Sequence, residues 1–395
     1  MEELLDDLRS HGLTVGNKPY LLNLMLTGTT HQLRKQIWLE LTGAAKQLRF
    51  NPSYYSRLLS DANAHHSIFA EMIDRDVGRT FPEEASFQLG SGKAWLHNVL
   101  VAYSWRNPNV GYCQGMNFIA ARFLSYGFRE EEAFWILSAV VESLLPIDYF
   151  SVLSGILIDQ RVFGALLNCA NPELKLHLET LGIDASMFCV KWLGCLFANT
   201  LSKEVVLRVW DVFMVQGSEL LFRAGLALLQ IMSEELLAAK TFEKAIHILS
   251  TRPGALTNAE LILELANDLM DSVTIRQIDQ YREALRPEAL KFMESKSWTA
   301  SPQTLSSDMC ASDDDCKKRT QRSASFFIFH AEAVRLREDY LSGEVEKYHF
   351  DEMGDGERLM RGRKSHKCWL EHHSFLSYRP RLNYYAETAP SSNCP

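Results

Sequence analysis

Apolar residues recur at helical spacing almost without interruption from about residue 30 to residue 290, and no other feature of this sequence limits its fold so strongly. Leu33, Ile37 and Leu41 form one such stripe, and the alternation typical of strands joined by hairpins is absent throughout. Further amphipathic or buried stretches follow at roughly 95–106, 116–126, 130–145, 156–168, 186–200, 203–214, 219–237, 241–249 and 258–270. The sequence therefore predicts an all-α domain.

Capping residues predict where two of these helices begin or end. Thr29-x-x-Gln32 resembles a capping box, which places the start of a helix immediately after it. A second helix, carrying Met116 and Phe123, is expected to end at Gly127, because glycine readily adopts the left-handed conformation that closes a helix.

The overall composition excludes several classes of protein. Hydrophobic residues make up 47% of the chain and charged residues 23%, which is enough apolar material for a sizeable core. The formal charge of -8 argues against a general nucleic-acid binder. The acidic N-terminus does not resemble a signal peptide, and no apolar run is long enough to span a bilayer. We therefore expect a cytoplasmic protein whose residence at any membrane comes from a partner.

The composition changes near residue 296, where Ser, Thr, Asp and basic residues become frequent. We predict an N-terminal extension (1–27), a helical domain (28–292), a flexible linker (293–325) and a C-terminal helix and tail (326–395). The linker contains Arg322-Ser-Ala-Ser325, which fits a basic-directed phosphorylation site at Ser325. The apolar start of the C-terminal helix would be costly to leave in water, so we expect it to dock on the domain or on a protein partner.

Several familiar site motifs are absent or incomplete. Gly90-Ser-Gly-Lys93 resembles the end of a phosphate-binding loop, but Ala94 stands where a Ser or Thr would hold magnesium. The histidine pairs at 65–66 and 372–373 lack ligand partners at metal-binding spacing. The 8 cysteines are scattered, and four of them lie in apolar surroundings and are expected to be reduced, buried thiols: Cys113, Cys169, Cys189 and Cys195. No metal, cofactor or hydrolase site is predicted.

Two short motifs carry the functional signal. The stretch IDRDVGRT contains Ile73-x-x-Asp76-x-x-Arg79 and places an arginine on a turn just before the breaker Phe81-Pro82. An exposed salt bridge would explain that arginine, and so would insertion into the active site of another protein. The stretch GYCQGMN contains Tyr112-x-Gln114, an amide side chain flanked by glycines at a loop-to-helix junction.

With the residues around them, these motifs resemble TBC domains, which activate the GTPase of Rab-family small G proteins. The matching pieces follow the family's order and cover about residues 24 to 290: Arg34-x-x-x-Trp38, Ile73-x-x-Asp76-x-x-Arg79, Tyr112-x-Gln114, WLGCLF at 192–197 and VWDVF at 209–213. One departure is visible, because Gly28 is followed by Thr29-Thr30-His31 where the family has a Gly-Ile-Pro-like turn.

The resemblance implies a two-lobed helical domain that activates a GTPase and is not itself an enzyme. Arg79 would be an arginine finger and Gln114 a glutamine finger, both inserted in trans into a GTP-bound Rab. GTP and Mg²⁺ would belong to the partner, so the chain would need no cofactor of its own. The alternative is a catalytically silent Rab-binding scaffold that uses its C-terminal region, although a pure binder needs neither Arg79 nor Gln114.

The remaining motif residues are expected to support the two fingers. Asp76 can accept hydrogen bonds that fix the approach of Arg79, Ile73 would anchor the segment in the core, and Gly78 would allow the bend. Tyr112 would either pack against the finger loop or bond to the backbone.

Arg34 and Trp38 are predicted to be structural. They are four residues apart on one helix face, so the guanidinium of Arg34 could lie over the indole of Trp38.

Overall fold

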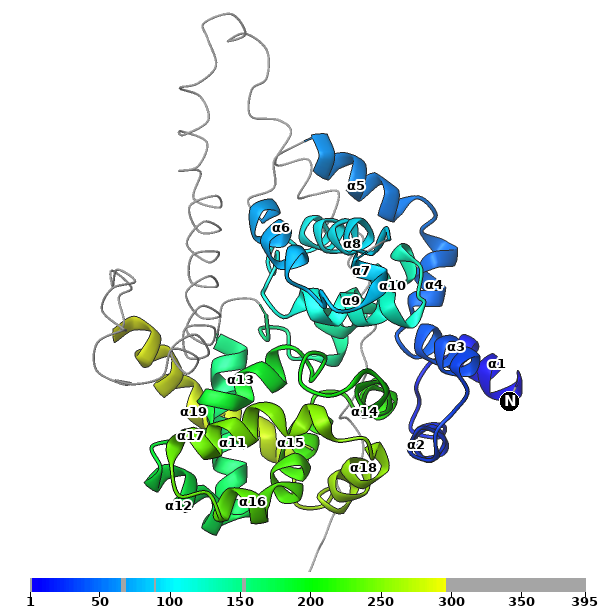
Figure 1. Cartoon of the computed structure of the whole chain (residues 1–395). Coiled ribbons are helices and arrows are strands. Elements are labelled where there is room, and N and C mark those ends of the chain that lie inside the picture. Colours follow the sequence, from blue (N-terminus) through cyan, green and yellow to red (C-terminus); the bar gives the residue numbers. More distant parts are fainter. Residues whose placement is uncertain (1, 65–68, 89, 151–153, 296–395) are drawn as a thin grey trace, which may run out of the picture. The chain divides into compact units, whose positions relative to one another are not determined.

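The structure, a computed structural model, describes residues 2–64, 69–88, 90–150 and 154–295 (Figure 1). Within these ranges the chain forms helices and turns and no strand, which confirms the all-α prediction. None of the helices described combines the length and the apolar character needed to span a membrane. The linker was predicted to start at residue 293, but residues 293–295 are the end of the helix Ile275–Ser295. The rest of the predicted linker with Ser325, and the C-terminal helix and tail, lie outside the described residues, so those predictions stay predictions.

The described residues up to 150, the first half of the described chain, form ten α-helices and one π-helix. These are α1 (Glu2–His11), α2 (Lys18–Thr27), α3 (His31–Leu41), α4 (Ala44–Phe50), α5 (Tyr54–Ala64), α6 (Ala70–Gly78), α7 (Ala85–Gln88), α8 (Gly92–Arg106), α9 (Met116–Tyr126), α10 (Glu130–Ala139) and η1 (Val140–Leu144). Helix α8 is the centre of this group, because it contacts α5, α6, α7, α9 and α10. Its apolar residues lie all around the helix, as expected of a helix covered on every side.

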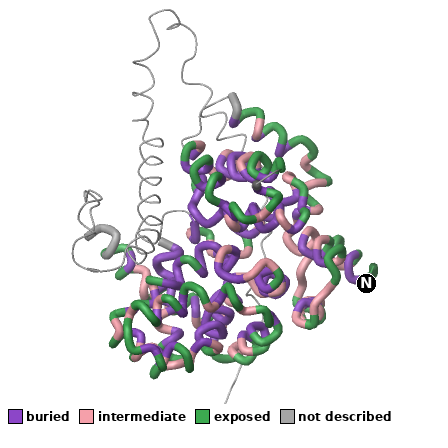
Figure 2. Tube along the Cα trace, viewed as in Figure 1, coloured by how far each residue is buried: buried purple, intermediate pink, exposed green. Residues whose placement is uncertain are grey.

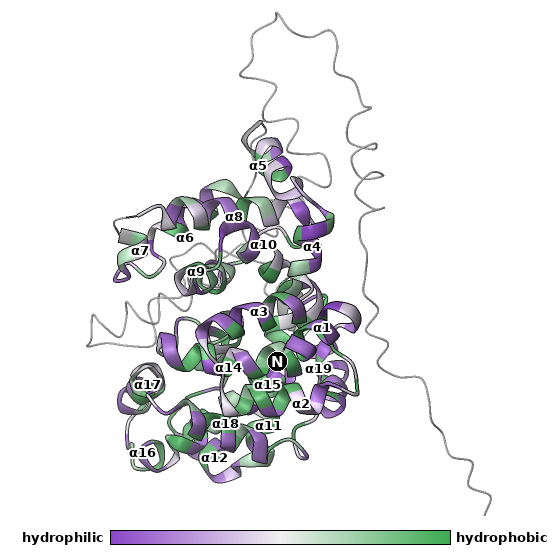
Figure 3. Cartoon of the chain, turned by 90° about the vertical axis from the view of Figure 1, so that its right-hand side faces the viewer, coloured by the Kyte–Doolittle hydropathy of each residue, from purple (hydrophilic) through white to green (hydrophobic). Residues whose placement is uncertain are grey.

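The described residues from 154 to 295, the second half, form nine α-helices and one short 3-10 helix. These are α11 (Ser154–Ala170), α12 (Pro172–Thr180), α13 (Ser186–Gly194), α14 (Lys203–Gln216), α15 (Glu219–Ile231), α16 (Ser233–Leu237), α17 (Phe242–Thr251), η2 (Pro253–Ala255), α18 (Ala259–Asp268) and α19 (Ile275–Ser295). Helix α11 contacts α12, α13, α15 and α19, and α15 also contacts α14 and α18. Buried residues run along the inner helices of both halves (Figure 2), while hydrophilic residues gather on outer helices such as α1 (Figure 3).

One predicted helix end is confirmed and one predicted start is wrong by a residue. Helix α9 closes at Gly127, which has a φ of 102°. Helix α3 begins after Thr30, whose side chain accepts a hydrogen bond from the amide of Leu33, so Thr29 is not the cap. The hydroxyl of Thr29 is instead buried without a hydrogen-bond partner among the described residues. Gln32 therefore falls one position short of the place that a capping box requires.

Three of the four described cysteines are buried thiols, as predicted. Cys113, Cys189 and Cys195 are buried, and burial raises the pKa of each thiol above its ordinary value, to about 12 for Cys195. These thiols are therefore protonated and unreactive at neutral pH. Cys169 corrects the prediction, because it is exposed on α11, where its sulfur lies 3.6 Å from the hydroxyl of Tyr281.

A single buried carboxylate joins α2, α3 and α14. Asp211 on α14 is fully buried and accepts hydrogen bonds from Arg34 at 2.7 and 2.8 Å, from the indole of Trp38 at 3.1 Å and from Arg208 at 2.8 Å. Arg208 also donates to the carbonyls of Met25 and Leu26 at the end of α2. We call Asp211, Arg34, Trp38 and Arg208 the Asp211 cluster.

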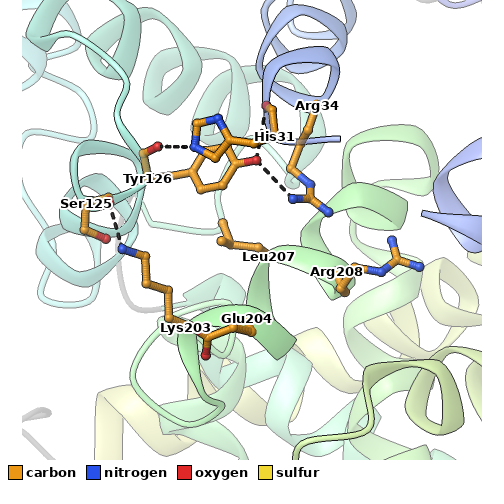
Figure 4. Close-up of a pocket in the computed structure, with 8 residues that line it drawn as sticks. All are labelled: His31, Arg34, Ser125, Tyr126, Lys203, Glu204, Leu207 and Arg208. Carbon is orange, nitrogen blue, oxygen red and sulfur yellow. Dashed lines mark hydrogen bonds between the residues drawn. The ribbon is translucent and has the colours of Figure 1, made fainter. Parts of the chain in front are cut away.

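The cluster gives Arg34 and Trp38 the structural place predicted for them, although by a different contact. The two side chains meet through Asp211, and the guanidinium of Arg34 lies 5.7 Å from the centre of the Tyr126 ring. A pocket of about 400 Å³ opens beside them (Figure 4), lined by His31, Arg34, Ser125, Tyr126, Lys203, Glu204, Leu207 and Arg208. Its basic groups already have partners in the chain, such as the carbonyl of Ser125 for Lys203 at 2.8 Å.

Replacing Asp211 should destabilise the fold strongly. In Asp211→Ala, the buried guanidinium of Arg34, the partly buried one of Arg208 and the Trp38 indole each lose an acceptor, and such a loss costs about 3–5 kcal/mol. Urea unfolding followed by circular dichroism measures the change. Asp279→Ala is the matched control: its carboxylate, 57% exposed, also pairs with an arginine and should cost no more than about 1 kcal/mol. Equal losses in the two variants would contradict the structural role of the cluster.

Candidate functional site

Helix α6 brings Arg79 to the surface and anchors it from below. Ile73 and Val77 are buried, as is the carboxylate of Asp76, and α6 packs against α8 and α9. Arg79 follows the last helical residue, and its side chain is 45% exposed. The core position predicted for Ile73 is therefore confirmed, and the sequence spacing leaves Arg79 at the end of an anchored helix.

The carboxylate of Asp76 contacts both motifs. One oxygen accepts from Nε of Arg79 at 2.8 Å and lies 2.7 Å from Nη2. The other oxygen accepts from the hydroxyl of Tyr112 at 2.5 Å, so Tyr112 bonds to a side chain and not to the backbone. Burial, together with the nearby Asp76 carboxylate, raises the pKa of Tyr112 well above its ordinary value, which keeps this hydroxyl protonated as a donor.

The bend after Arg79 occurs at Phe81, which corrects the expectation for Gly78. Gly78 lies in the last helical position, lacks a positive φ, and a Cβ added there would meet nothing within 4 Å. Phe81 has a φ of 41°, an unusual conformation for an aromatic residue and one often found near functional sites. Its buried ring is held by the guanidinium of Arg122, 4.0 Å from the ring centre, and by the edge of Phe118.

Gln114 lies on the connection between α8 and α9, whose glycines let the backbone pack closely against neighbouring residues. Gly111 has a φ of 62°, and a Cβ there would overlap the ring of Phe69. Gly115 has a φ of 114°, and a Cβ there would overlap the carbonyl oxygen of Gly194. Both positions therefore require glycine, and the backbone on either side of Gln114 has little room to move.

The side chain of Gln114 differs from Arg79 in exposure. Gln114 is only 8% exposed, and its Oε1 is buried with no hydrogen-bond partner among the described residues. Buried amide oxygens normally have a hydrogen-bond partner, so an unpartnered one at this position is unusual. Beside Arg79 lies a groove of about 230 Å³ lined by Met72, Arg75, Asp76 and Arg79. No group of three His, Cys, Asp or Glu side chains that could hold a metal occurs in the part of the chain that the structure describes.

Comparison with known proteins identifies the domain. The family model of the Rab-GTPase-TBC domain matches residues 31–237. The chain belongs to this family. Small G protein signaling modulator 3 from Homo sapiens is 36% identical over 265 residues, which are 66% of this chain and 35% of that relative. The chain thus matches only about a third of that protein.

Two solved structures support the same fold. The TBC domain of a Chlamydomonas flagellar RabGAP is 28% identical, with a TM-score of 0.59, covering 66% of this chain and 87% of that one. The Ypt/Rab-GAP domain of Gyp1p is 19% identical, with a TM-score of 0.57, covering 70% of this chain and 96% of that one. At this identity the likeness shows the fold alone. All the predicted TBC motif residues lie in the described part of the chain, and Asp76 brings Arg79 and Tyr112 together.

Two residues of the site were missed by the sequence reasoning. Thr80 and Asn117 are both fully buried, and Asn117 donates to the hydroxyl of Thr80 at 2.8 Å. Each stands next to or near a motif residue, Thr80 directly after Arg79 and Asn117 three positions after Gln114. Nothing in the spacing shows that the two would meet, although a polar residue in an otherwise apolar helix start is a signal that could have been followed.

Two glycines in the site should respond oppositely to alanine. Gly115→Ala places a Cβ on the Gly194 carbonyl at positive φ and should cost more than about 1 kcal/mol. Gly78→Ala meets no atom and removes a flexible residue from a helix, so stability should stay unchanged or rise by up to about 1 kcal/mol. Urea unfolding of both variants measures this. A large loss of stability in Gly78→Ala would show that the bend depends on Gly78.

Proposed function

We propose that this TBC domain activates a Rab-family GTPase in its GTP-bound state, with Arg79 and Gln114 inserted in trans. The observation that carries the proposal is the shared anchor of the two segments. Asp76 holds the half-exposed Arg79 with one oxygen, and with the other it holds Tyr112, two residues before Gln114. A surface salt bridge alone would not need a buried carboxylate that also accepts from a buried tyrosine.

Arg79 suits the stabilisation of charge on a phosphoryl group. Its guanidinium is planar, always charged and offers several donors. The contacts with Asp76 occupy Nε and Nη2, while Nη1 has no hydrogen-bond partner among the described residues. An arginine supplied to a GTPase from outside raises the hydrolysis rate by roughly 10³–10⁵, which corresponds to about 4–7 kcal/mol of transition-state stabilisation. In this proposal the guanidinium approaches the partner's γ-phosphate with its orientation set by Asp76.

Gln114 suits the positioning of the attacking water. Its amide offers one acceptor and two donors without adding charge beside the phosphates. The unpartnered Oε1 is the atom that would accept a hydrogen bond from the water, and the amide nitrogen would donate one to the γ-phosphate. Gln114 would thereby take the place of the GTPase's own glutamine.

The partner supplies what this chain does not hold. In the proposal GTP and Mg²⁺ are carried by the Rab, and the chain contributes side chains and no cofactor of its own. The chain is then an activator and not an enzyme with its own substrate. Its encounter with endomembranes would follow from the membrane-bound partner.

Single-turnover GTP hydrolysis tests the proposal with a panel of GTP-loaded Rabs. The wild type should accelerate one or a few of them. Arg79→Ala should lower that rate by at least about 10³-fold, because the transition-state charge loses its guanidinium. Gln114→Ala should lower it by about 10²-fold or more, because the water loses its positioning group.

Two control variants separate chemistry from folding. Arg49 is a half-exposed arginine paired with a mostly buried carboxylate, as Arg79 is, and Arg49→Ala should leave the rate unchanged. Gln160 is a buried glutamine with an unpartnered amide nitrogen, so Gln160→Ala controls for loss of a buried amide. If Rabs bind but none is accelerated, the scaffold interpretation replaces this one. Equal losses from Arg49→Ala and Arg79→Ala would also overturn the proposal.

A further inference from the structure

Asn117 connects the segment that carries Arg79 with the segment that carries Gln114. It lies in the first turn of α9 and is fully buried. Its Oδ1 accepts from the amide of Gly115 at 3.0 Å, and its Nδ2 donates to the hydroxyl of Thr80 at 2.8 Å. One amide side chain therefore contacts the residue after Gln114 and the residue after Arg79.

Thr80 continues this connection to Asp76. Its hydroxyl donates to the backbone carbonyl of Asp76 at 2.5 Å while accepting from Asn117. The result is a continuous path of hydrogen bonds that runs from Gly115 through Asn117 and Thr80 to Asp76. Asp76 is also the residue whose carboxylate holds Arg79.

The donors and acceptors along the path determine which way each side chain must be oriented. The amide of Gly115 can only donate, so Asn117 must turn its oxygen toward Gly115 and its nitrogen toward Thr80. The Thr80 hydroxyl uses its one proton on the Asp76 carbonyl and must accept from Asn117. A carboxylate at position 117 would place an oxygen against the Thr80 hydroxyl. That oxygen could accept a hydrogen bond only if the hydroxyl stopped donating to the backbone carbonyl of Asp76.

This path is a second link between the two segments. The first is the contact of Tyr112 with the Asp76 carboxylate. Two bodies joined at one point can still rotate about it, whereas a second link at a different point removes that freedom. The second link starts from the backbone of Gly115 and reaches the backbone of Asp76, so it acts on the main chain that presents both side chains.

We propose that Asn117 and Thr80 are positioning residues that set the placement of Gln114 relative to Arg79 for catalysis. The inference rests on the proposed GTPase activation. Neither side chain touches the partner, since both are fully buried. They act by holding the two segments in one geometry, and a misplacement of about 1 Å costs roughly 10²-fold in rate.

A double-mutant cycle tests the placement of Gln114. Thr80→Val keeps the shape of the side chain and removes the hydroxyl that joins the two segments. It should lower the maximal single-turnover rate about 10–100-fold, while the Rab concentration for half-maximal rate changes less than about threefold. In a Gln114→Ala background the further loss should shrink to within about threefold, because the group being placed is already absent. Equal losses in both backgrounds would overturn the proposal.

Two further variants separate placement from general damage to the core. Thr80→Ser keeps the hydroxyl and should retain the wild-type rate within about threefold. Ser138 is buried on α10, and its hydroxyl donates to the carbonyl of Phe134, four residues earlier, as that of Thr80 does to Asp76. Ser138→Ala should therefore leave the rate unchanged, and a loss equal to that of Thr80→Val would count against the proposal.

Amide hydrogen exchange tests the same link without any GTPase. Thr80→Val should speed exchange of the Gly115 amide at least about tenfold, because Asn117 loses the partner that holds its oxygen against Gly115. Ser138→Ala should not change that exchange. If the wild type activates no Rab, the proposed function fails, and the exchange result alone then decides whether the link exists. Unchanged exchange at Gly115 in Thr80→Val would overturn the link itself.

Discussion

A buried carboxylate needs a partner for each of its oxygens, and Asp76 satisfies this need with two side chains that belong to different motifs. Tyr112 is itself buried, whereas the side chain of Arg79 is half exposed. The contact with Arg79 is therefore screened by water and costs little to rearrange. In the proposed function, Asp76 would release part of the guanidinium toward a phosphate while Tyr112 keeps the carboxylate in place. Asp76 therefore orients Arg79 through a contact that the side chain can still leave.

Asp211 serves the architecture as Asp76 serves the site. It gathers donors from α3 and α14, and through Arg208 it also reaches the carbonyls that end α2. These contacts give Arg34 and Trp38 a structural place in this chain. Removing one partner from such a cluster leaves a buried charge without its partner, which destabilises the fold. Its neighbouring pocket (Figure 4) follows the same logic, since its basic side chains already have partners within the chain.

Periodicity predicted α3, most helices from α8 to α18, and no others, because helical spacing is a local property of the sequence. Eight helices were not predicted: α1, α2, α4, α5, α6, α7, α12 and α19. Gly127 was predictable, since its role as a cap is local. The start of α3 was not, because Thr29 and Thr30 can both cap and only the backbone decides between them. The bend after Arg79 was also misplaced. Its strain at Phe81 is held by Arg122, a contact across 41 residues that no local pattern contains.

The two proposed fingers differ in readiness. Arg79 already lies at the surface in an orientation fixed by Asp76, so little ordering remains when a partner arrives. Gln114 is turned inward, and its unpartnered oxygen carries a cost of about 1–3 kcal/mol that any new donor would relieve. Rotation of this side chain would bring its amide toward a docked partner. In the proposed function, the docking partner would meet Arg79 already in place and would turn the Gln114 side chain outward. The site would therefore be complete only when the partner is bound.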